Sequence, residues 1–168
     1  MSARRFLNGY PVHLQEQAES LLQQNKLDEY LSKRYRPGHE IRQAKALYGY
    51  AMDIKQTCLR QSPALSKVIY DDKIDVIHNA LGLHTQIARV QGNKLKSKRE
   101  IRVASLFRDA PEPFLKMIVV HELAHLREKD HNKAFYKLCC HMEPDYHQLE
   151  LDLRLYLTLL DHQGHVNW

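Results

Sequence analysis

The sequence contains, at residues 118–125, the stretch Ile-Val-Val-His-Glu-Leu-Ala-His, in which two histidines stand four residues apart. Residues four apart on an α-helix differ by about 40° in rotation and about 6 Å in rise, so His121 and His125 would point to one side. Imidazoles placed in this way can each reach a zinc ion at about 2.0–2.1 Å. Glu122 lies one step around the helix, where it can take a proton from a metal-bound water. The stretch predicts a helix that carries two metal ligands and a catalytic base.

A third histidine, His131, follows His125 by six residues. The intervening residues 126–130 are long enough to end the helix and bring the chain back toward the metal. They contain no glycine, but Asp130 or Asn132 can adopt the left-handed conformation at small cost. Three histidines leave the fourth position of a zinc ion open for water or substrate, as in catalytic sites. We therefore expect one Zn²⁺ per chain, or another divalent metal, at His121, His125 and His131.

The flanking sequence predicts helices on both sides of a small sheet. Apolar residues recur at helical spacing over residues 14–22 and 41–58, and proline-containing breaks stand at 36–38 and 61–63. After Pro111 we expect a helix to about residue 128, a second from about 132 and a third from Pro144. Between these regions, short runs rich in β-branched residues predict strands at 67–70, 74–77, 86–90 and 101–105, the first two joined by a turn.

This order of elements predicts an α+β fold of the zincin-like type with a mostly antiparallel sheet. The length of 168 residues suits a single domain over residues 1–168. Its helical N-terminal part would cover residues 1–63, and the sheet and metal-binding helices would cover 64–168. No apolar run approaches the roughly 20 residues that span a bilayer, and no apolar segment follows the N-terminal arginines, so we expect a cytoplasmic protein without a membrane partner. Three cysteines, two of them adjacent, are read as reduced thiols.

The active-site stretch, together with His131 and the residues 132–136 that follow it, resembles the YgjP-like metal-dependent hydrolases, a zincin-fold family grouped with the metallopeptidases. The resemblance covers residues 65–160 well and includes the segments 113–115 and 142–146. It implies that His121, His125 and His131 bind the metal and that Glu122 is the catalytic base. Many family members carry Trp-Gly-Ser-Cys where residues 90–99 stand here, and only Gly92 of that segment is kept.

Two substrate classes are compatible with these observations, peptides and nucleotides. A third hypothesis, a nucleic-acid-associated protease, has less support. As a peptidase, the chain would use residues 101–105 as an edge strand that pairs with an extended peptide. As a pyrophosphatase, it would hydrolyse UTP to UMP and diphosphate, an activity described for one family member, and basic residues would hold the triphosphate. Those basic residues are Lys94, Lys96, Lys98, Arg99 and Arg102. A nucleic-acid-associated protease would use the same basic residues, but no aromatic side chains alternate with them, so a nucleic-acid partner is not expected.

The remaining polar and aromatic candidates are interpreted as structural. Tyr136 and Tyr146 stand close in sequence to the ligands and could donate to an oxyanion, but core packing is the favoured interpretation. Four further histidines are interpreted as surface or core residues: His78, His84, His141 and His147. The sequence leaves the oligomeric state undetermined.

Overall fold

The computed structural model describes residues 3–77, 88–91 and 98–168. Along the chain the elements are η1 (Ala3–Arg5), α1 (Val12–Gln23), α2 (Leu27–Arg34), α3 (Ala44–Cys58), β1 (Leu65–Asp71), β2 (Ala88–Gln91), β3 (Lys98–Ala104), η3 (Ser105–Arg108), α4 (Glu112–Ala124), α5 (Lys133–Met142) and α6 (Tyr146–Gln163). The fold is α+β, as predicted. None of the helices in these ranges is long and apolar enough to cross a bilayer.

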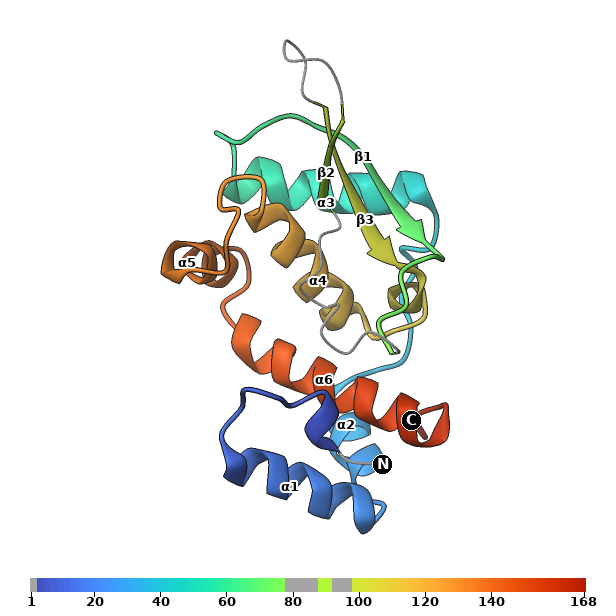
Figure 1. The fold of residues 1–168 in the computed structure, drawn as a ribbon. Coiled ribbons are helices and arrows are strands. Elements are labelled where there is room, and N and C mark those ends of the chain that lie inside the picture. Colours follow the sequence, from blue (N-terminus) through green and yellow to red (C-terminus); the bar gives the residue numbers. More distant parts are fainter. Residues whose placement is uncertain (1–2, 78–87, 92–97) are drawn as a thin grey trace.

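Helix α4 lies at the centre of the molecule, between the sheet with α3 on one side and α6 on the other (Figure 1). Every residue from Phe114 to Ala124 except Lys116 is buried. A helix that is apolar on all sides is stable only when other elements surround it, and burying this many large side chains contributes strongly to stability. The helix that carries the metal-site stretch is therefore a rigid core element.

The sheet has the order β1-β3-β2, with β3 in the centre. β1 and β3 are parallel, with Val68 opposite Ile101 and Tyr70 opposite Val103, and β2 is antiparallel to β3. The prediction of a mostly antiparallel sheet is therefore wrong. Ile101 and Val103 are fully buried on the helix-facing side of β3. Because side chains alternate along a strand, Arg99 shares that side, while Glu100 and Arg102 lie on the other.

One further expectation about the strands is wrong, and another holds for only part of its range. Residues 74–77 form no strand, because β1 ends in a turn at Asp72 and Lys73 and pairs with β3 rather than with the next segment. Residues 101–105 are not an edge strand throughout. Ile101 has β1 on one side and β2 on the other, residues 102–104 pair with β1 and have no β2 partner among the described residues, and Ser105 begins η3. Of the strand predicted at 86–90, residues 88–90 belong to β2, and residues 86 and 87 lie outside the described residues.

Helix α2 is held to α6 by a buried carboxylate. Asp152 is fully buried and accepts hydrogen bonds from the hydroxyls of Tyr30 at 2.8 Å and Tyr35 at 2.5 Å. Gln148 donates a third at 3.1 Å from the same helix. A buried carboxylate needs such donors to offset its lost hydration. These bonds fix α2 and the residue that follows it against the first half of α6.

Candidate metal centre

Three imidazoles converge at the end of α4. Nε2 of His125 lies 3.3 Å from Nε2 of His121 and 3.0 Å from Nε2 of His131. Two nitrogens bound to one zinc ion at about 2.0–2.1 Å and at tetrahedral angles lie about 3.3–3.4 Å apart. The two separations measured from His125 are close to this value, and one ligand atom from each histidine lies within 4.8 Å of the other two. The three histidines form a group that could hold a metal within the described residues.

His131 reaches this position without any left-handed residue in the turn. The helix ends at Ala124, and the amides of Arg127 and Glu128 both bond the Ala124 carbonyl, at 3.1 and 2.9 Å. Neither Asp130 nor Asn132 has a positive φ, in contrast to the expectation that one of them would supply the turn. Asn132 instead caps α5, since its side chain accepts a hydrogen bond from the amide of Phe135 at 2.8 Å.

Phe135 packs against all three imidazoles. Its ring centroid lies 4.9 Å from that of His121, 4.6 Å from that of His125 and 4.9 Å from that of His131. The side chain is fully buried at the start of α5. An apolar ring in this place restricts the rotamers of the three histidines and excludes water from one side of the site. The sequence places Phe135 on the apolar face of its helix but gives no sign of this contact.

Each of the two helical histidines has a partner for its second ring nitrogen. Nδ1 of His125 lies 2.9 Å from the carbonyl oxygen of Glu128, and Nδ1 of His121 lies 2.8 Å from the hydroxyl of Tyr146. A carbonyl can only accept, so the proton of His125 stands on Nδ1 and the lone pair of Nε2 points toward the other histidines. Burial, followed by the charge of His125, lowers the pKa of His131 and favours its neutral, metal-binding form.

Glu122 is buried next to His121 in the sequence and has an unpartnered carboxylate oxygen. Its side chain is 2% exposed, and Oε2 has no hydrogen-bond partner among the described residues. Burial raises the pKa of Glu122 to about 8. An unpaired buried carboxyl is costly for a fold and is typical of functional sites. The donor set and this orphaned oxygen fit a metal with a carboxyl group that handles protons next to it.

The basic residues expected near the site separate into two groups. Nη1 of Arg99 lies 3.4 Å from the carbonyl oxygens of His125 and Leu126, at the end of α4. Arg102 faces away and pairs with Asp71 at 3.2 Å and with Glu100 at 3.5 Å. Lys94 and Lys96 lie outside the described residues, and Lys98 is the first residue of β3. Arg99 is thus beside the site, whereas Arg102 is not.

The other tyrosines and histidines near the candidate ligands in sequence do not line the candidate metal site among the described residues. Tyr146 is fully buried on the Nδ1 side of His121, so it faces away from the converging Nε2 atoms and is not positioned as an oxyanion donor. Tyr136 packs on Tyr146 and on the exposed His147. His141 is exposed, and His78 and His84 lie outside the described residues.

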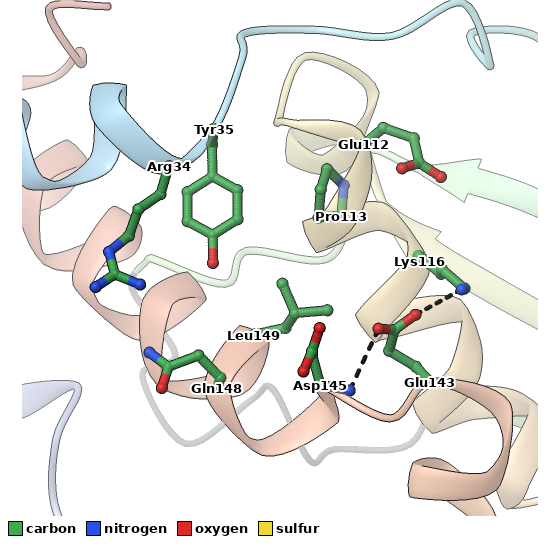
Figure 2. A pocket seen from close by; sticks show the side chains of 9 residues that line it. All are labelled: Arg34, Tyr35, Glu112, Pro113, Lys116, Glu143, Asp145, Gln148 and Leu149. Carbon is green, nitrogen blue, oxygen red and sulfur yellow. Dashed lines mark hydrogen bonds and ion pairs between the residues drawn. The ribbon is translucent and has the colours of Figure 1, made fainter.

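A pocket of about 590 Å³ lies at the opposite end of α4 from the metal site (Figure 2). It is lined by Arg34, Tyr35, Glu112, Pro113, Lys116, Glu143, Asp145, Gln148 and Leu149, and none of the three histidines belongs to it. Across it, Lys116 pairs with Glu143 at 2.5 Å. This ion pair attaches the connection between α5 and α6 to α4, directly before Tyr146.

Comparison with known proteins agrees with this geometry. The YgjP-like, metallopeptidase domain model matches residues 8–156. The chain belongs to the YgjP-like family. It is 59% identical to the UTP pyrophosphatase of Escherichia coli (strain K12) over 160 residues, which are 95% of this chain and 96% of that protein. No solved structure matches the chain significantly. The family and the relative identify the chain as a hydrolase, and the family with the three histidines indicates a divalent metal.

Proposed function

We propose that this chain is a zinc-dependent pyrophosphatase that hydrolyses UTP to UMP and diphosphate, with His121, His125 and His131 as ligands and Glu122 as the general base. The observation that carries the proposal is the approach of Nε2 of His125 to Nε2 of His131 at 3.0 Å and of His121 at 3.3 Å, beside a buried carboxyl with an unpartnered oxygen. The choice of UTP is supported by the 59% identity with the Escherichia coli enzyme.

Three neutral imidazoles would hold the ion and leave a position for water or substrate. When bound, the metal would supply Lewis acidity and lower the pKa of a coordinated water. Glu122 would take the proton of the attacking water and return it to the departing product. The raised pKa of Glu122 suits this role because a base that holds a proton near neutral pH can both accept and release it. The bond broken joins the α- and β-phosphates.

The position of Arg99 is an argument for a phosphate substrate. Its guanidinium stands at the end of α4 beside His125, and a cation near the metal stabilises negative charge on phosphoryl oxygens. Arg102 is paired with two carboxylates and does not contribute in this way. The proposal therefore assigns substrate attraction to Arg99 rather than to the whole set of basic residues named from the sequence.

A peptidase is the second candidate, because the matching family model describes a metallopeptidase domain. The same ligands and the same base would act on an amide bond. Among the described residues, β2 pairs with β3 only as far as Ile101, so the edge that this hypothesis expected over residues 101–105 is shortened to residues 102–104. The nucleic-acid-associated protease stays an untested prediction, and salt-dependent DNA binding would test it.

The deciding assay incubates the zinc-loaded protein with UTP and measures UMP and diphosphate. We expect both products in equal amounts, and Glu122→Gln should lower the rate by about 10²–10⁴-fold. Glu16→Gln, a matched change on the exposed face of α1, should leave the rate unchanged. Casein and a mixed peptide library are tested in parallel. If peptides are cleaved in a Glu122-dependent way and UTP is not, the peptidase replaces the pyrophosphatase.

A further inference from the structure

The second ring nitrogen of His121 contacts a residue 25 positions away in sequence. Nδ1 lies 2.8 Å from the hydroxyl of Tyr146, and both side chains are fully buried. Tyr146 is the first residue of α6, so this contact joins a candidate ligand on α4 to a different helix. His125 differs, because its Nδ1 partner is a backbone carbonyl only three residues away.

The hydroxyl of Tyr146 has a second partner besides His121. This second partner is the thiol of Cys139, which is fully buried on α5. Burial raises the pKa of the Cys139 thiol to about 12 and raises the pKa of Tyr146 well above its ordinary value, so both groups stay neutral. A phenolic proton directed at this sulfur would leave an oxygen lone pair to accept from His121.

We propose that Tyr146 is a positioning residue for the metal ligand His121, holding the ring proton on Nδ1 so that the lone pair of Nε2 points to the metal. This inference rests on the proposed metal site. The resulting chain runs from His121 Nδ1–H to the Tyr146 oxygen, and from the Tyr146 O–H to Cys139. Partners of this kind set the tautomer and orientation of a ligating histidine.

The residues before Tyr146 are attached to α4, and this attachment fixes the position of Tyr146 relative to His121. Glu143 pairs with Lys116 of α4, and its second oxygen accepts a hydrogen bond from the backbone amide of Asp145 at 3.3 Å (Figure 2). The connection before Tyr146 is therefore attached to the same helix that carries His121. Both ends of the His121–Tyr146 contact consequently belong to rigid, buried elements.

Tyr146→Phe tests the proposal, because it keeps the ring and removes only the hydroxyl. We expect zinc to bind about 10–100-fold more weakly to this variant than to the wild type. With Co²⁺ as the probe, the visible absorption spectrum should also shift, since the field of one ligand changes. Tyr136→Phe, at a neighbouring half-buried tyrosine that packs on Tyr146, should match the wild type in both measurements. Unchanged affinity and an unchanged Co²⁺ spectrum in Tyr146→Phe would overturn the proposal.

Two further measurements distinguish failure of the Tyr146 proposal from failure of the proposed metal site. Cys139→Ser keeps an acceptor for the Tyr146 hydroxyl and should retain more zinc affinity than Cys139→Ala. In the metal-free wild type, ¹⁵N NMR should show the proton of His121 on Nδ1, and a proton on Nε2 would refute the inference even if Tyr146→Phe did not fold. If the wild type binds neither zinc nor Co²⁺, the proposed metal site itself fails, whatever the tautomer of His121.

Discussion

Nη1 of Arg99 lies 3.4 Å from the carbonyl oxygen of His125, so a strand residue contacts the end of the helix that carries two of the candidate ligands. A second carbonyl, that of Leu126, lies at the same distance. Cations at the C-terminal end of a helix interact favourably with its dipole. Arg99 consequently has a structural effect on the site in addition to the substrate attraction proposed for it.

Arg99→Ala should lower the free energy of unfolding by about 1–2 kcal/mol, because the last carbonyls of α4 lose a partly buried cationic partner. Urea denaturation of the metal-free protein measures this difference. Lys67→Ala, at an exposed position on β1, is the control and should change stability by less than about 0.5 kcal/mol. Equal stability of the Arg99 and Lys67 variants would show that the contact does not stabilise the helix end.

Phe135→Leu should weaken zinc binding by about tenfold, since the ring that packs against all three imidazoles is replaced by a smaller side chain. It should also lower the free energy of unfolding by about 1–2 kcal/mol. Phe107→Leu is the matched control, because Phe107 is equally buried but belongs to η3, before α4. That variant should lose similar stability and keep the zinc affinity of the wild type. Equal loss of zinc affinity in both variants would mean that Phe135 acts only through general core stability.

Much of the candidate site could be predicted from local sequence. The spacing of His121 and His125 on a helix determines that their side chains share one side, and the short segment to His131 limits how far that residue can lie from them. The opposite orientations of Arg99 and Arg102 are also a property of local sequence, because residues three apart on a strand point to opposite sides. The same alternation implies that the basic residues cannot all face one phosphate chain.

The remaining features depend on contacts between distant segments. Residues 67–70 and 74–77 are both rich in β-branched residues, but only the first becomes a strand, because β3 supplies it with a parallel partner. The hydroxyl of Tyr146 reaches His121 only after α6 has packed on α4. The contact of Phe135 with three imidazoles likewise follows from the angle at which α5 meets α4, which no spacing rule predicts.

The raised pKa of Glu122 should make the stability of the metal-free protein depend on pH. Its pKa is about 8 in the folded protein and near 4.5 in the unfolded chain, so the folded state holds a proton that the unfolded state releases between these pH values. The free energy of unfolding of the wild type should therefore fall as the pH rises from 4.5 to 8. Glu122→Gln, which cannot titrate, should become more stable than the wild type by a few kcal/mol over this window, at about 1.4 kcal/mol per pKa unit.

Chelator-treated wild type and Glu122→Gln are compared by urea denaturation at several pH values on both sides of neutrality. A constant difference between the two proteins across this range would contradict a raised pKa for Glu122. The comparison depends only on differences between the proteins, so titration of other groups cancels.

In the proposed site, His121, His125 and His131 hold one metal ion that Glu122 does not ligate. Metal content after purification and zinc loading, measured by mass spectrometry on dialysed protein, tests this assignment of ligands and base. We expect about one zinc ion per chain in the wild type and in Glu122→Gln, and almost none in His121→Ala. Full metal content in His121→Ala, or its loss in Glu122→Gln, would refute the proposed site.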